Sequence, residues 1–496
     1  MRLVGISDSL PENTVQCSRG FTPFEKYYFW RNKLNMYSNF RVAVEYTEEL
    51  DIDAIYYALK EMVKEHSSLS MNAYKKKHYI PWLQFPYYLK FMDKYKLNDV
   101  LKIVNDDSLS VTNIFNDLQN VHFKYSTDEP LWSLILLNKK TLVYYSDHLL
   151  FDGSSGLNFH RVFSKYFSEY KEKKKYLNHK ICSIDDRMNN ILFDIDNDSN
   201  TLNLAPKPSD LIDYSIPLVY LLYVIMLICF PKSLINLIKY YFIDDGDISK
   251  SRTYNMISLS KKMIQLNNNK DHCKLVHISQ EKLQTLISDC RKYKVKLTSL
   301  LVVMSLLSIS QITGDEKDTM VVIPVNSRDK IKDEKVRKDF GLYLGDLNLE
   351  LPPVTKMCRN GQINWSFVKY INDYIHNSFA NSQRDLGLTS LVDTKIFLEQ
   401  RKQCYDNSMI STLLVSNLGN LKESQKNQRV IEKPNDDVEL FENAYFDQPC
   451  QSAVLSLFAM NVISTPKGGA NLALHSVNSK WLDIFNEGVN QQLSQF

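Results

Sequence analysis

The sequence predicts an α/β fold for this chain. Helical and strand periodicities alternate through the first 170 residues and again after residue 279, and we find no internal repeat. The length of 496 residues corresponds to about three domains of average size or to two large ones. A hydrophobic fraction of 44% beside a charged fraction of 24% is typical of globular proteins, so we expect a buried core.

The first half opens with a helix, a strand and a second helix. Residues 22–25, Thr-Pro-Phe-Glu, form a capping box with proline at the first helical position, which predicts a helix to about Tyr37. Apolar and polar residues alternate over 39–46, which predicts a strand, and helical spacing returns over 51–66. Two apolar runs, 131–138 and 141–146, predict a buried β-hairpin that leads into the histidine discussed below.

The second half follows a polar and then an apolar stretch. Residues 171–213 are rich in Lys, Asp and Asn, which predicts a solvated linker. Ser279 opens a predicted helix, and residues 297–309 predict a helix that is apolar on nearly all sides. We expect strands at 319–325, 340–351, 411–415, 454–463 and 471–477.

Residues 214–231 contain no charged side chain, unlike the rest of the chain. As a helix, this stretch would measure ~27 Å, which is just enough for the core of a bilayer. A second apolar piece, 233–242, carries only Lys239 as a charge. Two interpretations therefore remain open, a membrane-associated segment or a wholly buried helix.

Charge and cysteine content exclude several functions. Sixty Lys and Arg residues against 57 Asp and Glu leave a net charge of +3, which gives no general attraction to nucleic acid. The eight cysteines lie far apart without a Cys-x-x-Cys pair, so we expect reduced thiols and no zinc site. Residues 1–13 lack the apolar region of a secretory signal, and a glycine-rich phosphate loop is absent from the sequence.

The most informative local pattern is Ser-Asp-His-Leu-Leu-Phe-Asp-Gly at 146–153. It places His148 at the end of a buried strand, with Asp152 four residues later and Gly153 available for a tight turn. Ser154 and Ser155 could cap the helix that follows. A histidine with a nearby aspartate is a weak signal alone, since such a histidine is commonly a hydrogen-bonded core residue. A metal site at this histidine would need further ligands, so we expect no metal.

This block resembles the His-x-x-x-Asp-Gly signature of the CoA-dependent acyltransferase superfamily, which includes chloramphenicol acetyltransferase, plant BAHD enzymes and peptide-synthetase condensation domains. Within that superfamily the chain looks most like the yeast alcohol acetyltransferases and their N-acetyltransferase relatives. Four more blocks recur in the expected order over roughly residues 20–485, at 27–40 (ending in Tyr-Ser-Asn-Phe), 324–328 (Pro-Val-Asn-Ser-Arg), 413–419 (Leu-Leu-Val-Ser-Asn-Leu-Gly) and 464–471 (Ser-Thr-Pro-Lys-Gly-Gly-Ala-Asn).

The resemblance implies a two-domain fold like those of chloramphenicol acetyltransferase and the BAHD enzymes, with the active-site tunnel between the halves. On this basis we divide the chain into an N-terminal tail (1–19), an N-terminal half (20–200), a linker with the apolar segment (201–250) and a C-terminal half (251–496). Plant members carry Asp-Phe-Gly-Trp-Gly, of which 339–345 retains only Asp-Phe-Gly, so the loop geometry on the CoA side is open to question.

The resemblance also implies roles for individual residues. His148 would be the general base, and Asp152 would be structural and pair with Arg328 to fix the loop with Gly153. For Asp152, a helix N-terminal carboxylate is the competing interpretation. Ser416 would donate a hydrogen bond to the tetrahedral oxyanion, with an ordinary strand-end hydrogen bond as the alternative.

The expected reaction is acetyl transfer from acetyl-CoA to the hydroxyl of an apolar alcohol. The alternatives are acetylation of the amine of a lipid-like amino alcohol or toxic compound, and an inactive membrane-associated binding protein. A single membrane span at 214–231 would separate the two halves, so an interfacial patch within 214–242 or internal burial remains. We expect a monomer on the cytoplasmic side of the endoplasmic reticulum or on lipid droplets, or else a soluble cytoplasmic protein.

Overall fold

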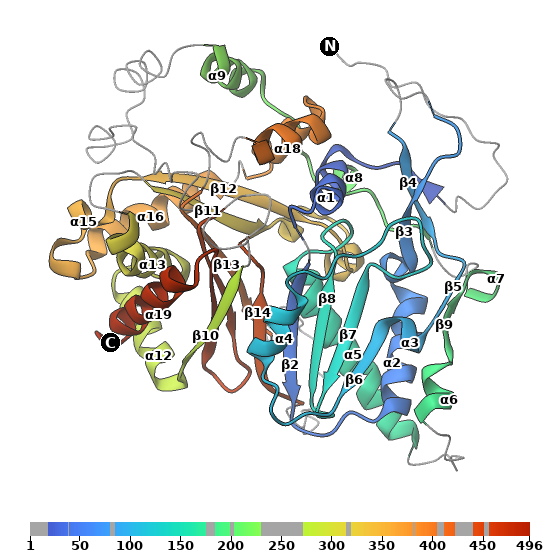
Figure 1. Cartoon of the computed structure of the whole chain (residues 1–496). Helices are drawn as coiled ribbons and strands as arrows, with labels where there is room; N and C mark the ends of the chain where they lie inside the picture. The colour runs from blue at the N-terminus through green and yellow to red at the C-terminus, as the bar shows by residue number, and fades with distance from the viewer. Residues whose placement is uncertain are drawn as a thin grey trace.

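The chain forms two halves, each built on its own β-sheet, in the computed structural model (Figure 1). The structure describes residues 18–37, 39–79, 85–174, 184–198, 203–229, 271–313, 319–379, 382–403, 411–421, 440–450 and 456–496. Each half has its own hydrophobic core of buried side chains. The fold is the expected two-domain α/β arrangement.

The first sheet has five strands in the order β14-β2-β8-β7-β6. They are β14 (Phe441–Asp447), β2 (Phe40–Tyr46), β8 (Thr141–Ser146), β7 (Trp132–Leu137) and β6 (Leu101–Val104). The predicted hairpin is confirmed, since β7 and β8 pair antiparallel from Trp132↔Ser146 to Leu137↔Thr141. Helices α2 (Ile52–Glu65) and α5 (Gly153–Lys174) pack together beside this sheet.

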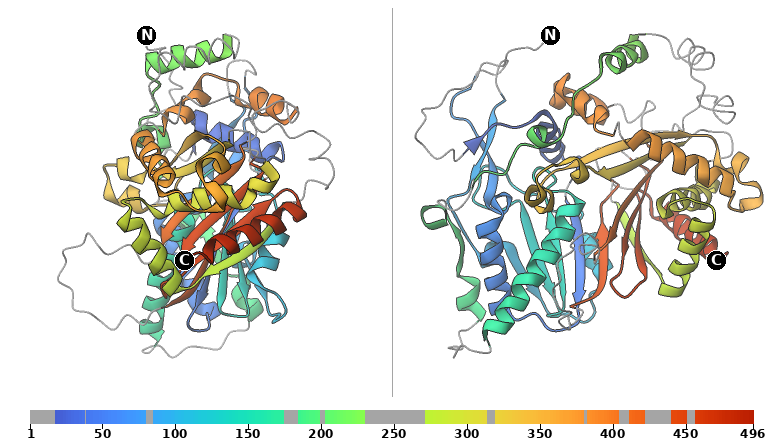
Figure 2. Two further views of the ribbon diagram at one scale, coloured as in Figure 1. Left: turned by 90° about the vertical axis from the view of Figure 1, so that its left-hand side faces the viewer. Right: turned by 180° about the vertical axis from the view of Figure 1, so that it is seen from behind.

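The second sheet has six strands in the order β10-β16-β15-β13-β11-β12. They are β10 (His272–Ile278), β16 (Ala470–Ser476), β15 (Phe458–Ser464), β13 (Leu413–Asn420), β11 (Thr319–Asn326) and β12 (Leu344–Leu351). Strand β13 runs parallel to both of its neighbours, and the other pairs are antiparallel. Helices α12 (Gln280–Lys292), α13 (Leu297–Thr313), α16 (Trp365–Ser378) and α19 (Ser479–Leu493) accompany this sheet (Figure 2).

One strand crosses from the second half to the first. Strand β14 lies late in the chain but pairs antiparallel with β2 at the edge of the first sheet. Local periodicity did not predict β14, and the predicted strand at 340–351 begins only at Leu344, because the residues before it form a loop between the halves.

The prediction of a solvated linker over residues 171–213 is partly wrong. Strand β9 (Ile191–Asp194) pairs with β5 (Lys94–Lys96), and its Leu192 and Phe193 are fully buried. In the sequence these two apolar residues stand in a stretch that is mostly polar and charged, so composition alone did not predict a strand.

Helix α1 (Pro23–Lys33) begins as the sequence predicts. The Thr22 side chain accepts from the Glu25 amide, and the Glu25 carboxylate accepts from the Thr22 amide at 2.8 Å, which completes the capping box. The helix ends at Lys33, four residues earlier than predicted, and the chain then turns through Asn35 at φ 53°. This turn carries Tyr37 toward the site described next.

The apolar stretch forms helix α9 (Leu218–Cys229), which extends from the top of the molecule in Figure 1. Its Leu218, Val219, Leu222 and Ile225 side chains are 46–80% exposed. The interpretation of this stretch as a wholly buried helix is therefore wrong for these four residues. Residues 230–242 lie outside the described residues. Among the described helices, none alone is long and apolar enough to cross a bilayer, although the bent pair α12 and α13 passes that test by length and composition.

Candidate active site

A cavity lies between the two halves, where the resemblance places the tunnel. The first half contributes helix α1 and the loop that contains His148, and the second half contributes β11, β12 and β13. The end of β14 supplies Phe446, and Gln448 follows it. The cavity therefore brings together residues from opposite ends of the chain.

His148 lies in the wall of this cavity and is only 4% exposed. Its Nδ1 lies 2.7 Å from the carbonyl oxygen of Phe151. Because a carbonyl can only accept, Nδ1 carries the hydrogen, and Nε2 is the nitrogen with a free electron pair. The rings of Tyr28, Tyr37 and Phe40 surround the imidazole, with centroids 4.8, 5.2 and 4.9 Å away.

The surroundings keep His148 uncharged. Burial, followed by the positive charge of Arg31, lowers the pKa of His148 to about 3, although Asp152 acts in the opposite direction. At neutral pH the imidazole is therefore unprotonated, which is the state that can accept a proton.

Asp147 anchors the chain beside this histidine. Its carboxylate accepts from the Leu149 amide at 2.6 Å, from the Tyr125 hydroxyl and from the side-chain amide of Asn32. Burial raises the pKa of Asp147 to about 6. Because Asn32 lies on α1, this contact fixes the helix against the His148 loop.

Asp152 combines the two roles that the sequence left as alternatives. Its Oδ2 accepts from Arg328 Nη1 at 2.7 Å and from the Tyr343 amide at 2.9 Å, while Oδ1 accepts from the Ser155 amide at 2.8 Å. Oδ1 therefore caps helix α5, and Oδ2 makes the expected ion pair with the other half. Burial would raise the pKa of Asp152, but the Arg328 guanidinium holds it below its ordinary value.

The Asp-Phe-Gly loop completes this junction. The carbonyl of Gly341 accepts from Arg328 Nη2 at 3.0 Å and from Ser155 Oγ at 2.9 Å. Asp339 Oδ1 lies 2.6 Å from His66 Nδ1, which is a second polar contact between the halves. The Phe340 side chain packs in the hydrophobic core of the first half. The three retained residues of the motif thus hold the halves together, although the rest of the motif differs.

Gly153 leaves no room for a larger residue beside the cavity. A β-carbon at this position would lie 2.7 Å from Cδ2 of Leu418 on β13. Leu418 also lines the cavity, so a side chain at 153 would push it from its place.

Ser416 reaches the cavity from the second sheet. It lies on β13 opposite Asn461 of β15, is 5% exposed and shares the lining with His148. The structure thus brings together His148, Asp152, Gly153, Arg328 and Ser416, all within the cavity wall or the junction that supports it.

Sequence reasoning missed Arg31 and the aromatic side chains of α1. The resemblance of the block at 27–40 to the family implies no role for an individual residue within it. Tyr27, Tyr28 and Arg31 line the cavity. The only available signal was the density of aromatic residues in that block, which is equally typical of a core helix.

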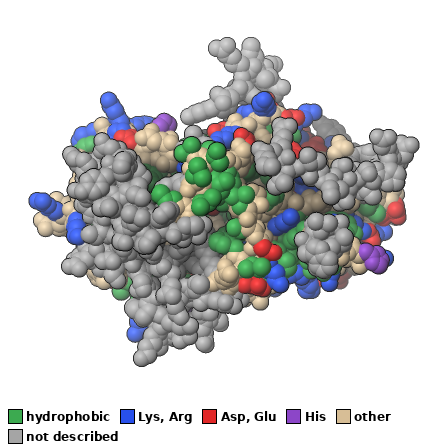
Figure 3. Space-filling model, turned by 90° about the horizontal axis from the view of Figure 1, so that it is seen from above, with side chains coloured by type: hydrophobic (Ala, Val, Ile, Leu, Met, Phe, Trp, Pro, Cys, Tyr) green, Lys and Arg blue, Asp and Glu red, His purple; other side chains and the backbone are tan. Residues whose placement is uncertain are grey.

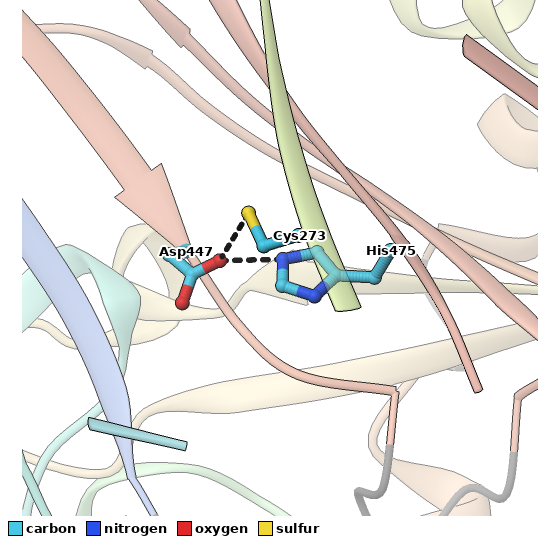
Figure 4. Close-up of side chains that lie close together, drawn as sticks. All are labelled: Cys273, Asp447 and His475. Atoms are coloured by element: carbon cyan, nitrogen blue, oxygen red, sulfur yellow. Dashed lines mark hydrogen bonds and ion pairs between the residues drawn. The ribbon is translucent and has the colours of Figure 1, made fainter. Parts of the chain in front are cut away.

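A second polar cluster, whose side chains are not among those that line the cavity, is shown in Figure 4. Cys273, Asp447 and His475 are all buried and close enough to one another to be considered as metal ligands. His475 Nε2 lies 2.5 Å from Asp447 Oδ1, and Nδ1 lies 2.8 Å from Asp271 Oδ2, while Arg41 pairs with the other oxygen of Asp447. Two cationic and two anionic side chains balance one another here, so we describe the cluster as an ion-pair network.

This network joins the sheets of the two halves. Arg41 lies on β2, Asp447 on β14 and His475 on β16. Burial opposes the charged form of His475, but Asp447 and Asp271 overcome this effect and the pKa of His475 is raised well above its ordinary value. His475 is therefore positively charged in the folded protein.

Two solved structures illustrate the fold that this chain shares with known proteins. The TRI3 trichothecene 15-O-acetyltransferase of Fusarium sporotrichioides matches with a TM-score of 0.60 at 12% identity, covering 98% of this chain and 99% of that one. The first condensation domain of the CDA synthetase matches with a TM-score of 0.58 at 12% identity, covering 97% and 96%. The fold is that of the two-domain CoA-dependent acyltransferases.

The sequence comparisons define the family within this class. The profile described as "Alcohol acetyltransferase" matches residues 22–486, so the chain belongs to the alcohol acetyltransferase family. N-acetyltransferase SLI1 of Saccharomyces cerevisiae is 23% identical over 482 residues, which cover 92% of this chain and 94% of that protein. An uncharacterized protein of Schizosaccharomyces pombe is 35% identical over 140 residues, 28% of this chain and 30% of that one. The protein is an acetyltransferase, and its family implies an acyl-CoA co-substrate.

Proposed function

We propose that this protein transfers the acetyl group of acetyl-CoA to the hydroxyl of an apolar alcohol, with His148 as the general base. The observation that carries the proposal is the buried His148, whose Nδ1 is held by the carbonyl of Phe151 so that Nε2 is available to a substrate in the cavity. Its lowered pKa keeps it unprotonated at neutral pH.

The proposed reaction needs no covalent enzyme intermediate. Nε2 of His148 removes the hydroxyl proton as the acceptor oxygen attacks the thioester carbonyl carbon, giving a tetrahedral oxyanion. Ser416 donates a hydrogen bond to this oxyanion. The carbon–sulfur bond then breaks, and the imidazolium returns the proton to the departing thiolate, so the products are an acetate ester and free CoA.

Asp152, Gly153 and Arg328 support the site in this proposal. The ion pair between Asp152 and Arg328 holds the loop that follows His148 against the second half. Close packing of Gly153 against Leu418 sets the distance between the loop and β13. These three residues therefore position the base relative to Ser416 without touching the reacting atoms.

Polar and apolar residues both line the cavity, and its apolar part suits the hydrocarbon portion of an acceptor. Tyr27 and Tyr28 approach from the first half, and Val325, Leu344 and Leu414 approach from the second. Such side chains bind a hydrocarbon by removing its surface from water.

An amine acceptor is the second candidate, because the relative SLI1 is named an N-acetyltransferase. The same base serves an alcohol and a neutral amine. A panel of alcohols and amino alcohols, incubated with acetyl-CoA and examined by mass spectrometry, separates the two. Acetate esters support the proposal, and amides alone would contradict it.

We also propose that an apolar surface attaches the protein to the cytoplasmic side of the endoplasmic reticulum or to lipid droplets; a soluble cytoplasmic protein is the alternative. Leu218, Val219, Leu222 and Ile225 of α9 are exposed, and so are Leu391, Val392, Ile396 and Phe397 at and before α18 (Thr394–Gln403). Both helices lie at the top of Figure 1, and hydrophobic side chains gather on this face in Figure 3. With a net charge of only +3, membrane affinity would come from this surface.

A further inference from the structure

Gln448 is a buried polar residue of the cavity wall that the proposed mechanism does not use. It directly follows β14, is 9% exposed and lines the cavity that contains His148. Its backbone carbonyl accepts from Asn461 Nδ2 at 2.9 Å, but its side-chain amide makes no hydrogen bond with the described residues. Both atoms of that amide keep surface that water can reach. The amide is therefore open to a ligand in the cavity.

The first sheet brings Gln448 close to His148. Strand β14 pairs antiparallel with β2, and Asp447 stands opposite Arg41. Continued by one residue, this register brings Gln448 to the level of Phe40. The ring centroid of Phe40 lies 4.9 Å from that of His148. Gln448 therefore lies on the side of the cavity where the proposed base acts.

The second sheet connects Gln448 to Ser416. Asn461, which donates to the Gln448 carbonyl, lies on β15 directly opposite Ser416 of β13. Neighbouring strands are ~4.8 Å apart, so one strand spacing separates Ser416 from the residue that holds Gln448. The Ser416 hydroxyl also makes no hydrogen bond with the described residues and keeps accessible surface. Two unpartnered donors thus reach the cavity from adjacent positions.

The chain on both sides of Gln448 is held in place. Asp447 pairs with His475 Nε2 at 2.5 Å, and the Cys450 amide donates to Asp271 Oδ2 at 3.0 Å. These groups belong to the buried network that joins the two sheets. A donor on such a fixed segment needs little rearrangement when charge develops beside it.

We propose that the side-chain amide of Gln448 donates a second hydrogen bond to the tetrahedral oxyanion, beside the one from Ser416. Side-chain amides and hydroxyls serve as such donors, and they act most strongly where water is excluded. The thioester oxygen gains its negative charge only as the acceptor attacks, so this bond stabilises the transition state more than the bound substrate. The inference rests on the proposed acetyl transfer and adds a catalytic residue to it.

Two variants of Gln448 test the proposal. Gln448→Met keeps the length of the side chain without a donor, and Gln448→Glu keeps its shape but replaces the amide with a carboxylate. With acetyl-CoA and the best acceptor of the panel, kcat should fall about 10²- to 10³-fold in both variants, the effect of removing one oxyanion donor. The ratio kcat/KM should fall equally, because the bond forms only in the transition state.

Gln492 provides the matched control. It is a buried glutamine of α19, 6% exposed, and its side chain is not among those that line the cavity. Gln492→Met should therefore keep both kcat and KM of the unaltered protein.

Two kinetic outcomes would overturn the inference. A Gln448→Met variant with unchanged kcat overturns it and leaves acetyl transfer intact. A higher KM with unchanged kcat also overturns it, since Gln448 would then bind the substrate and the transition state equally. If Gln448→Met does not fold, Gln448→Glu decides, because its side chain has the same shape as glutamine.

Binding of two CoA analogues separates this inference from the proposed function. One is the CoA thioether of trifluoroacetone, whose hydrate resembles the tetrahedral intermediate, and the other is the CoA thioether of acetone, which is planar at the same carbon. In titration calorimetry the unaltered protein should bind the first about 10²-fold more tightly or better. Gln448→Met should lose most of this preference, even if no acceptor is acetylated. Equal affinities in the unaltered protein, or a preference that survives in Gln448→Met, would overturn the inference.

Discussion

Arg328 Nη1 donates a hydrogen bond of 2.7 Å to Asp152 Oδ2, and this ion pair joins the two halves directly behind the His148 loop. Both side chains are nearly inaccessible to water, at 6% and 4% exposure. The same carboxylate caps helix α5 through the Ser155 amide. One side chain therefore sets the start of a helix, the position of the loop and the contact between the halves.

Asp152→Asn should destabilise the protein strongly, because it leaves Arg328 buried without a counter-charge. We expect the free energy of unfolding to fall by about 3–5 kcal/mol in urea titration. Glu334→Gln removes one partner of an exposed ion pair with Lys338 and should leave the unfolding midpoint unchanged. An Asp152→Asn variant as stable as the unaltered protein would mean that the ion pair contributes little.

His148 should make the fold less stable in acid. Its pKa is about 3 in the folded protein and ~6.5 when unfolded, so below pH 6.5 the unfolded chain binds a proton that the folded protein excludes. The contribution of His148 to the free energy of unfolding should therefore fall by about 1.4 kcal/mol for each pH unit between pH 6.5 and pH 3. Urea titrations of the unaltered protein and His148→Gln measure the difference. Identical pH dependence in both would contradict the buried, neutral histidine.

His475 should act with the opposite sign. Its folded pKa is raised, so the stabilisation from its positive charge is complete below the unfolded pKa of ~6.5 and is lost as the pH rises through the folded pKa. His475→Gln should cost more stability at pH 6 than at pH 9, as measured by urea unfolding. The exposed His376 on α16 provides the control, since His376→Gln should have little effect at either pH. An equal cost at both pH values would show that His475 is uncharged.

The apolar surface at α9 should be needed for membrane binding and not for folding. Leu222→Asp with Ile225→Asp should move the protein from the floating vesicle fraction to the bottom of the gradient in flotation with phospholipid vesicles, while the melting temperature stays unchanged because both side chains are exposed. Val121→Asp, at an exposed apolar residue elsewhere, is the matched control. Loss of folding in the α9 variant would indicate a buried segment, and unchanged flotation would indicate that another surface binds the membrane.

Features encoded by neighbouring residues could be predicted from the sequence. The capping box of Thr22 and Glu25 fixes the start of α1, and the apolar runs around β7 and β8 fix the hairpin before His148. The pairing of Asp152 with Arg328 came from the resemblance, because local spacing gives no information about residues 176 positions apart.

Features that depend on distant parts of the chain could not be predicted in this way. The pairing of β14 with β2 and the network of Arg41, Asp447 and His475 join segments that are remote in sequence. Arg31 resembles any other basic residue near the end of a helix until the fold encloses it. Such residues are revealed only by burial and by the absence or presence of a partner.

The most direct test of the proposed mechanism is the rate of acetyl transfer by His148→Ala. With acetyl-CoA and the best acceptor of the panel, kcat should fall by ~10²- to 10⁴-fold, the contribution of a general base. His376→Ala, at the exposed histidine, should retain full activity. Turnover by His148→Ala at the rate of the unaltered protein would contradict the assignment of His148 as the base.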